Sequence, residues 1–272
     1  MIDIVGLAET NDEIAPGYRL LRLQLDQDVE VRPGQFAMLK PRGMFEPLLR
    51  RALAVYRVDG PRRISFLYQV LGRGTKALAQ IGKGGEVETL LPLGNSWPIP
   101  SNQERAIVVA GGIGSASVLM LCEELKQADV ETRVFFGAAN AVAAAGCGLQ
   151  DFRFCGFPLA LSTVDGSAGE HALVTAPLQR CLKEGWGRGV TIYTCGPWAM
   201  MKRVSELADR FEVNCLASLE APMGCGFGVC VGCVVAVKTD GPLGYGSYKR
   251  VCTDGSIFNA KAVCWDINAM GH

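Results

Sequence analysis

The chain has 272 residues, enough for two domains and a small appendage, and 49% of them are hydrophobic, so a core can form without disulfide bonds. Its 27 basic and 27 acidic side chains balance, which argues against a nucleic-acid-binding surface or a polybasic membrane patch. Met1–Val5 lacks the features of a signal peptide and glycines break the longest uncharged stretch, 106–122, so we expect a cytoplasmic protein without a membrane span, whose cysteines stay reduced.

The first part of the chain, residues 1 to about 100, alternates short apolar runs with turns rich in glycine and proline, such as Pro33-Gly34. Runs with the composition of strands lie at 18–25, 52–56 and 64–68. Several short strands separated by such turns predict an antiparallel β-barrel.

Two segments of this barrel have residues suited to phosphate. Arg50 and Arg51 open the second of these runs, and Gly74-Thr75 lies in a turn after the third. Arginine offers two parallel donors to a phosphate, and a Gly-Thr turn offers backbone and hydroxyl donors. Taken alone, both segments are better explained as a surface arginine pair and an ordinary turn.

Residues from about 104 to 212 have a different rhythm, in which strands and helices alternate. The uninterrupted apolar run 106–110 is typical of a strand covered on both faces. Further strands are expected at 133–136, 159–163 and 190–194, and helices at 118–125, 172–183 and 198–210. This alternation predicts a parallel α/β sheet.

Two turns in this domain follow strands and contain small residues. Gly111-Gly112-Ile113-Gly114 lies between a strand and a helix, where the backbone can close on a pyrophosphate. Because the motif is not a complete G-x-G-x-x-G, a turn without a ligand explains it equally well. Cys195-Gly196 ends another strand of the same sheet, and ligands of open α/β sheets bind at such ends.

The C-terminal part, from about residue 213, is rich in glycine and cysteine. Cys225-x4-Cys230-x2-Cys233, followed by Cys252, has the spacing of plant-type 2Fe–2S ferredoxins. The alternatives are coincidence and a zinc site, but structural zinc usually takes ligands in short-spaced pairs, which this spacing does not match. The sequence therefore predicts a 2Fe–2S cluster held by these four thiolates.

Together these motifs resemble the ferredoxin–NADP reductase superfamily. In chain order they are Arg51-x-x-Ala54, Gly72-x-Gly74-Thr75, Pro92-Leu93-Gly94-Asn95, Gly111-Gly112-Ile113-Gly114, Thr194-Cys195-Gly196-Pro197 and Ser218-Leu219-Glu220. The stretches 219–233 and 251–258 are similar, more specifically, to the iron–sulfur electron-transfer subunits of NAD-linked dihydroorotate dehydrogenases.

The resemblance implies three parts: an FAD-binding β-barrel at 1–100, an NAD-binding α/β domain at 101–212, and a 2Fe–2S segment at 213–272. It also implies which residues bind FAD and NAD. They are Arg51, Ala52, Leu53, Ala54, Tyr68, Gln69, Val70, Gly74, Thr75, Gly111, Gly112, Gly114, Cys195 and Gly196.

The implied activity is electron transfer in pyrimidine biosynthesis. Electrons from the FMN of a dihydroorotate dehydrogenase catalytic subunit reach NAD⁺ through the cluster and FAD, in a heterotetramer of two copies of each subunit. We find no Ser/His/Asp set, no H-E-x-x-H and no P-loop, so no catalytic side chain is predicted.

Residues 138–142 lack a cation for a 2′-phosphate, which favours NAD(H) over NADP(H). Phe227, Val229 and Val231, between the ligands, are expected to contact the partner.

Two alternatives stay open. The first is the small subunit of a bifurcating transhydrogenase or of a related hydrogenase or sulfide reductase, which shares this organisation. The second is a non-enzymatic docking module with a zinc knuckle.

The sequence departs from the resemblance in two places. Ala52 and Ala54 stand where proline and serine are usual, and Ser115-Ala116-Ser117 lacks the usual proline at a helix start. The alanine at 54 removes a hydroxyl that would face the flavin, although backbone donors can remain.

Overall fold

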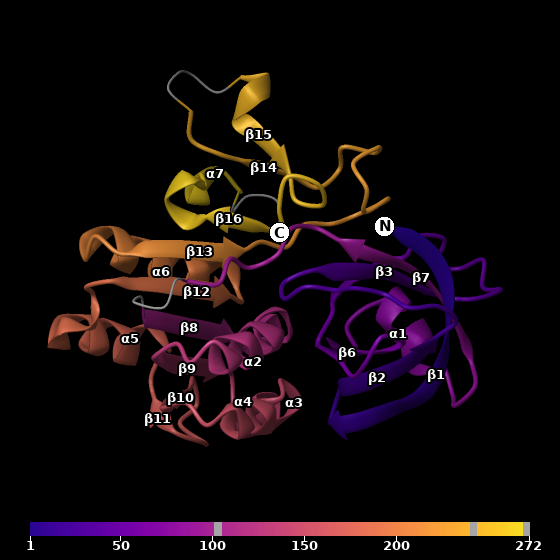
Figure 1. Ribbon diagram of the computed structural model, residues 1–272, viewed down its shortest axis with the longest axis horizontal. Coiled ribbons are helices and arrows are strands. Elements are labelled where there is room, and N and C mark those ends of the chain that lie inside the picture. The colour runs from indigo at the N-terminus through magenta and orange to yellow at the C-terminus, as the bar shows by residue number, and fades with distance from the viewer. Residues whose placement is uncertain (101–104, 240–243, 269–272) are drawn as a thin grey trace.

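The computed structural model describes residues 1–100, 105–239 and 244–268. Figure 1 shows a barrel formed by the N-terminal part, an α/β sheet beside it, and a small C-terminal unit above the junction of the two. The predicted boundary between the first two parts lies next to residues 101–104, outside the described residues. The predicted fold class, an antiparallel barrel with a parallel α/β domain and a small cysteine-rich segment, is confirmed.

The barrel is one antiparallel sheet of seven strands in the order β4-β3-β7-β1-β2-β6-β5. The strands are β1 (Ile2–Ala15), β2 (Tyr18–Leu25), β3 (Phe36–Pro41), β4 (Arg51–Ala54), β5 (Arg57–Val58), β6 (Arg63–Gln69) and β7 (Glu86–Leu93). The three strands expected from apolar runs are present as β2, β4 and β6. The sequence analysis did not identify β1, β3 and β7, and in β1 and β7 charged residues interrupt the apolar alternation.

The barrel interior follows from the two-residue period of a strand. In β2, Leu21, Leu23 and Leu25 are buried, whereas Arg22 between them is exposed. A short helix, α1 (Arg73–Ala79), follows β6 and buries Leu78 against this interior. The turn that was predicted to support a phosphate therefore lies at the start of α1.

The α/β domain contains a second seven-stranded sheet, in the order β11-β10-β9-β8-β12-β13-β16. Its strands are β8 (Arg105–Gly111), β9 (Thr132–Ala138), β10 (Leu159–Thr163), β11 (Glu170–His171), β12 (Val190–Cys195), β13 (Asn214–Ser218) and β16 (Ile257–Asn259). All neighbours are parallel except β16, which pairs antiparallel with β13. Two strands from the C-terminal part thus extend this sheet.

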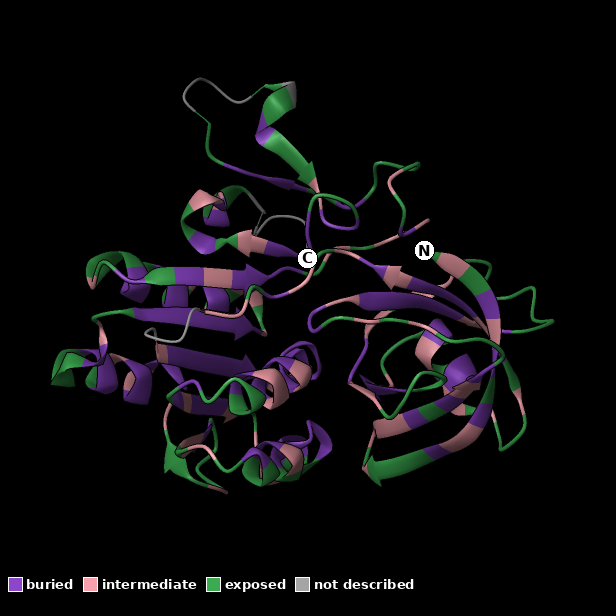
Figure 2. Cartoon of the chain, viewed as in Figure 1, coloured by how far each residue is buried: buried purple, intermediate pink, exposed green. Residues whose placement is uncertain are grey.

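Helices cover both faces of this sheet (Figure 1). They are α2 (Leu119–Gln127), α3 (Ala141–Gly146), α4 (Leu149–Cys155), α5 (Thr175–Cys181) and α6 (Trp198–Arg210), with a 3₁₀ turn at Gly112–Ser117 and a π-helical turn at Leu182–Trp186. Ala106 and Val108 of β8 lie in the core with α2, and Ile107 and Val109 in the core with α5 and α6. Both faces are buried, as the uninterrupted apolar run predicts (Figure 2).

The helix expected at 172–183 begins three residues later. Pro177 has no N–H and is tolerated only in the first turn of a helix, which sets the start of α5 at Thr175. Helices α3 and α4 were not identified from the sequence, because each is only six or seven residues long.

The C-terminal unit contains a two-stranded ribbon of β14 (Val234–Ala236) and β15 (Tyr248–Arg250), 3₁₀ turns at Tyr245–Ser247 and Ala260–Ala262, and the helix α7 (Trp265–Asn268). Val235, Cys233 and Cys252 share a core with β8, β12 and the barrel residue Met38. The unit therefore packs on both larger parts. Within the described ranges, no helix is both long and apolar enough to cross a membrane.

Candidate functional site

A cleft of about 1000 Å³ lies between the barrel and the carboxyl ends of the parallel strands. This volume is at the upper end of the range for ligand pockets. Eleven of the fourteen residues predicted to bind FAD or NAD line it. They are Ala52, Leu53, Ala54, Tyr68, Gln69, Thr75, Gly111, Gly112, Gly114, Cys195 and Gly196. Residues far apart in the chain therefore meet at one site.

Three predicted residues, Arg51, Val70 and Gly74, are not among the lining residues. Arg51 lies directly against the backbone of Gly74, and a Cβ at position 74 would overlap the guanidinium group. The Thr75 hydroxyl accepts hydrogen bonds from the N–H groups of Leu71, at 2.9 Å, and Gly72, at 3.2 Å, which fixes the turn. Within the described ranges no carboxylate forms an ion pair with Arg51, whereas its neighbour Arg50 pairs with Asp3 and Glu88, so the charge of Arg51 is available to an anion held at this turn.

The two small-residue turns of the α/β domain are in contact. Strands β8 and β12 are neighbours, and the crossovers from them run in opposite directions along the sheet, which is where such sheets bind ligands. A Cβ on Gly114 would lie 2.6 Å from the Gly196 Cα. Only glycine lets the two backbones approach this closely, so the backbone at this point is open to a ligand.

Cys195 is buried at the base of the cleft. Burial raises the pKa of its thiol, although hydrogen bonds with Ser218 and Ser117 oppose the rise. The two serine hydroxyls are 3.1 Å apart. A thiol that stays protonated is a poor nucleophile, so Cys195 shapes the cleft rather than attacking a substrate.

The far end of the cleft is lined by Gly137, Ala138 and Ala139, which follow β9. Asn140 accepts a hydrogen bond from the Ala143 N–H at 2.8 Å and caps α3. One arginine, Arg203 of α6, also lines the cleft, and its Nη1 lies 2.9 Å from Glu206 Oε2. A cation is therefore present, although a carboxylate already pairs with it.

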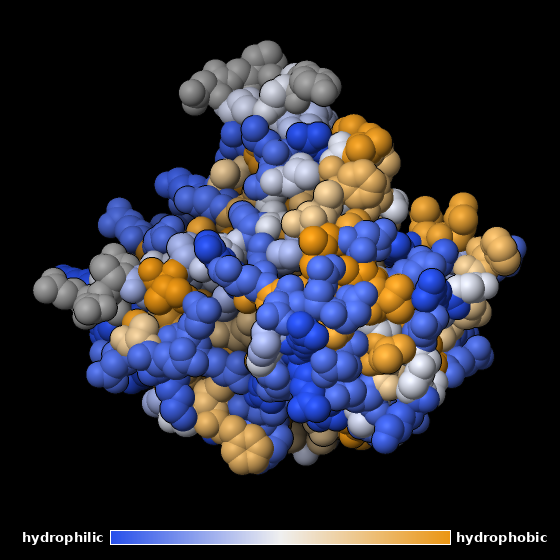
Figure 3. Space-filling view, turned by 45° about the vertical axis from the view of Figure 1, so that its right-hand side comes forward, coloured by the Kyte–Doolittle hydropathy of each residue, from blue (hydrophilic) through white to orange (hydrophobic). Residues whose placement is uncertain are grey.

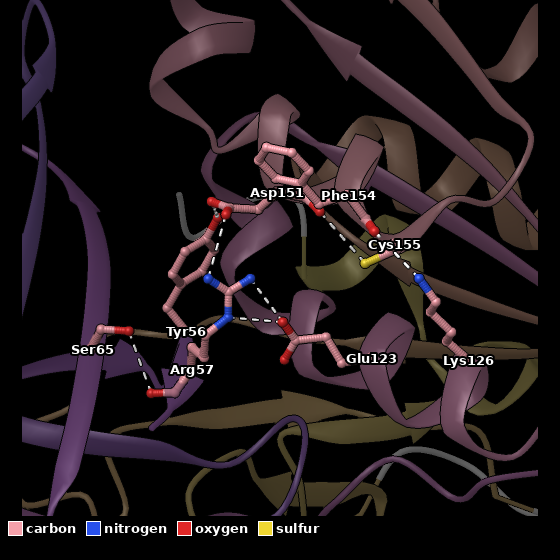
Figure 4. Close-up of polar contacts among 8 residues, drawn as sticks. All are labelled: Tyr56, Arg57, Ser65, Glu123, Lys126, Asp151, Phe154 and Cys155. Carbon is pink, nitrogen blue, oxygen red and sulfur yellow. Dashed lines mark hydrogen bonds and ion pairs between the residues drawn. The ribbon is translucent and has the colours of Figure 1, made fainter. Parts of the chain in front are cut away.

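A polar network joins the two walls of the cleft (Figure 4). Arg57 of the barrel reaches Glu123 of α2 at 2.7 Å and Asp151 of α4 at 3.4 Å. The hydroxyl of the buried Tyr56 donates to Asp151 at 2.6 Å. Burial, followed by the hydrogen bond to Asp151, raises the pKa of Tyr56. These contacts hold the barrel and the α/β domain together beside the cleft.

The four predicted cluster ligands lie together and form two pairs. The Cys225 Sγ accepts a hydrogen bond from the Cys230 N–H at 3.5 Å and also interacts with the Cys230 side chain. The Cys233 and Cys252 side chains form a hydrogen bond, and an electrostatic interaction with Cys225 contributes to raising the pKa of Cys252. Among the described residues, no three His, Cys, Asp or Glu side chains are placed to hold one metal ion. Two pairs of thiols suit a two-iron cluster with two thiolates on each iron.

Cys225 and Cys252, one from each pair, differ in proton affinity. Burial raises the pKa of Cys225, but the N–H groups of Cys230, Phe227 and Val229 outweigh it and lower the pKa to about 6. Burial and the Cys233 thiol raise the pKa of Cys252 to about 12. Backbone donors aimed at a sulfur stabilise the thiolate that an iron ligand requires. The loop at Cys225 is therefore shaped for a bound anion.

Exposed apolar side chains lie within and near the cysteine loop, which is residues 225–233. Val229 is 74% exposed, and Phe227 and Val231 are also exposed. The loop between β3 and β4, not identified from the sequence as functional, exposes Phe45 by 88% and Leu48 by 75%. The signal was present in the sequence, because apolar residues at 44, 45, 48 and 49 lie between Gly43 and Arg50. Figure 3 shows hydrophobic surface gathered on the upper right of the molecule.

Comparisons with known proteins give a consistent result. Residues 220–264 match the family model described as the iron–sulfur cluster binding domain of dihydroorotate dehydrogenase B. The electron transfer subunit of dihydroorotate dehydrogenase B (NAD(+)) from Desulforamulus reducens is 32% identical over 237 residues, which cover 86% of this chain and 87% of that protein. The homolog of this subunit from Aquifex aeolicus is 33% identical over 266 residues, covering 94% and 99%.

Among solved structures, a chain of an NADH-dependent reduced ferredoxin–NADP oxidoreductase, studied for flavin-based electron bifurcation, superposes with a TM-score of 0.84. It is 26% identical, and the match covers 97% of this chain and 91% of that one.

Proposed function

This chain belongs to the family of electron transfer subunits of dihydroorotate dehydrogenase B, and on that premise we propose how its residues serve that activity. It passes electrons from the catalytic subunit through a 2Fe–2S cluster and FAD to NAD⁺, in pyrimidine biosynthesis. When bound, the cluster would carry single electrons, and FAD would take up two of them with a proton and deliver them to NAD⁺ as a hydride. The observation that carries the proposal is that the paired cysteines lie beside a cleft lined by both sets of predicted nucleotide-binding residues.

Each wall of the cleft has its own task. Arg51 and the Gly74-Thr75 turn would hold the flavin pyrophosphate, because a guanidinium group with no ion-pair partner among the described residues lies beside a fixed turn there. Ala52 to Ala54, Tyr68, Gln69 and Val70 would border the flavin. The turns at Gly111–Gly114 and Cys195-Gly196 would receive the nicotinamide dinucleotide, since they lie where the crossovers diverge. The network of Tyr56 and Arg57 keeps the two walls at a fixed separation.

The partner is a dihydroorotate dehydrogenase catalytic subunit. We propose that this subunit carries FMN, that it covers the cysteine loop, and that the assembly is a heterotetramer of two copies of each chain in the cytoplasm. The exposed Phe227, Val229 and Val231 support this placement, because apolar side chains next to a cluster are otherwise in water. The β3–β4 loop with Phe45 and Leu48 extends the same apolar surface and would add to the contact.

Reconstitution tests this function directly. We expect the purified chain to bind FAD and to assemble a cluster from iron and sulfide, with both visible in the absorption spectrum. Zinc gives no visible absorption, so a colourless protein that binds only zinc would contradict the proposal. Co-expressed with the catalytic subunit of its own organism, the chain should reduce NAD⁺ with dihydroorotate.

The structural relative studied for electron bifurcation supports a second candidate function, that of a transhydrogenase subunit. Its likeness over 97% of this chain supports a transhydrogenase role for the same cleft. Co-purification distinguishes the two, because the transhydrogenase would use a different partner and would show no dihydroorotate-dependent activity.

A further inference from the structure

Asn95 follows β7, at the end of the Pro92–Asn95 motif, for which the cofactor sites supply no role. Its side-chain Nδ2 donates to the Ile257 carbonyl oxygen at 2.9 Å, and its Oδ1 accepts from the Ile257 N–H at 2.9 Å. The backbone N–H of Asn95 donates to the Gly255 carbonyl oxygen at 2.7 Å. One barrel residue thus satisfies three backbone groups of the segment 255–257, in the C-terminal part of the chain.

The same segment is held from its other side by the α/β sheet. Ile257 pairs with Ser218 of β13, and the Leu219 N–H donates to the Ser256 carbonyl oxygen at 2.8 Å. The Ser256 hydroxyl donates to the carbonyl oxygen of Gly34, a second barrel residue, at 3.3 Å. All three parts of the molecule therefore meet at residues 255–257.

This segment joins the cysteine site to the cleft. Ser256 lines the cleft, and Cys252 is a proposed cluster ligand only four residues earlier. An extended chain covers at most about 3.4 Å per residue, so the Cα atoms of Cys252 and Ser256 are separated by at most about 14 Å. The position of residues 255–257 therefore helps to set the distance between the cluster and a flavin in the cleft.

We propose that Asn95 is a positioning residue for electron transfer, which fixes the Cys252–Ile257 segment to the barrel and so fixes the distance between cluster and flavin. The inference rests on the proposed function. The rate of single-electron transfer falls steeply with distance, whereas hydride transfer between nicotinamide and flavin takes place elsewhere in the cleft. Loss of the Asn95 amide should therefore slow the first step and spare the second.

The test compares Asn95→Ala with Asn259→Ala in the FAD- and cluster-loaded chain. Asn259 is a matched control, because it lies in β16 and its side chain also accepts a backbone hydrogen bond, from Lys261 at 3.0 Å. Asn95→Asp has the same shape and keeps the acceptor for the Ile257 N–H, but a carboxylate oxygen replaces the Nδ2 donor and repels the Ile257 carbonyl oxygen. Under anaerobic conditions NADH gives the flavin a hydride, which carries two electrons. The cluster takes these electrons one at a time and passes them to an external one-electron acceptor, so two acceptor molecules are reduced per NADH.

Three measurements decide the outcome. The Ile257 amide should exchange its hydrogen about fivefold faster in Asn95→Ala, in the loaded and the empty protein, because a net hydrogen-bond contribution of about 1 kcal/mol is lost. Stopped-flow absorption should show flavin reduction by NADH at the wild-type rate and slower cluster reduction. The cluster potential should stay at the wild-type value, which excludes an effect on the ligands. Asn95→Asp should also slow cluster reduction, and Asn259→Ala should match wild type.

The failures are distinguishable. Cluster reduction at the wild-type rate in a folded Asn95→Ala protein would overturn the positioning role, and so would equal slowing in Asn259→Ala. A wild-type chain that binds neither FAD nor a cluster would overturn the proposed function itself. If Asn95→Ala fails to fold, Asn95→Asp supplies the same comparison.

Discussion

The cysteine loop and the cleft beside it differ in where their chemistry resides. The cysteine loop and Cys252 concentrate their chemistry in four side chains, three of which are close together in sequence. Backbone N–H groups lower the pKa of Cys225. The cleft distributes its chemistry over strands β4 and β6 and over the segments that follow β6, β8 and β12, and most of its predicted contacts are small residues that expose backbone. A concentrated site is easily destroyed by one substitution, whereas a distributed site loses affinity gradually.

The largest expected effect is at a cluster ligand. Cys252→Ser should abolish the cluster, because a 2Fe–2S cluster needs two thiolates on each iron and Cys252 completes the second pair. Iron and sulfide analysis of the purified variant measures this. Cys264→Ser is the control, since Cys264 has no part in either pair. An intact cluster in Cys252→Ser would remove the basis of the comparison.

The surface of the cysteine loop should also respond strongly to one change. Phe227→Glu would place a charge in the proposed interface, and a central interface residue contributes roughly 2 kcal/mol or more, about thirtyfold in affinity. Co-purification with the catalytic subunit measures the loss, and the iron content should not change. Phe154→Glu on α4 is the control, because Phe154 is an exposed aromatic residue outside this surface, 71% exposed against 43% for Phe227. Equal assembly of the two variants would place the interface elsewhere.

FAD binding is expected to depend most on Arg51, which lies against Gly74 beside the flavin wall of the cleft. Arg51→Ala should weaken FAD binding by about ten- to a hundredfold, since charged hydrogen bonds contribute about 1.5–3 kcal/mol. Equilibrium dialysis of the flavin gives the value. Arg73→Ala, a nearby arginine outside the lining residues, should leave it unchanged. A complete loss of FAD from Arg51→Ala would show that this wall is as concentrated as the cysteine loop.

The dinucleotide end tests whether backbone alone selects the cofactor. We expect NADH to be used about tenfold or more better than NADPH, because Gly137 to Ala139 offer no cation to a 2′-phosphate and Glu206 already pairs with Arg203. Steady-state kcat/KM with the two cofactors measures this preference. Glu206→Gln removes the ion pair of Arg203, which could then bind a 2′-phosphate, so the ratio of kcat/KM with NADH to kcat/KM with NADPH should fall. Equal efficiency of the wild type with both cofactors would contradict the prediction.

The smallest effect is expected at Ala54, which lines the cleft. Ala54→Ser restores a hydroxyl whose hydrogen bond contributes about 0.5–1.5 kcal/mol at most. We expect almost no change in FAD affinity or potential, because Arg51 and the Gly74-Thr75 turn carry most of the binding. A tenfold tightening of FAD would instead show that this wall lacks a donor in the wild type.

Several features could be read from the sequence because they depend on local order. The cysteine spacing predicted four residues that the structure brings together, and the run 106–110 predicted a strand buried on both faces. Such features survive because strand periodicity and ligand spacing are properties of short segments. Strands β1 and β7 were not predicted from the sequence, because their charged residues lie at positions whose orientation is defined only by the folded barrel.

Other features were decided by the tertiary structure alone. Three contacts join residues that are far apart in the chain. They are the close approach of Gly114 and Gly196, the ion pairs of Arg57 with Glu123 and Asp151, and the hydrogen bonds of Asn95 with Ile257. The sequence by itself predicted the cluster, because a 2Fe–2S cluster requires cysteines at particular spacings, whereas FAD and NAD were implied by the family resemblance of the motifs. The relative placement of cleft and cysteine loop was set only when packing of the barrel, sheet and C-terminal unit selected one arrangement, because pairings between distant segments follow from the whole fold and not from local order.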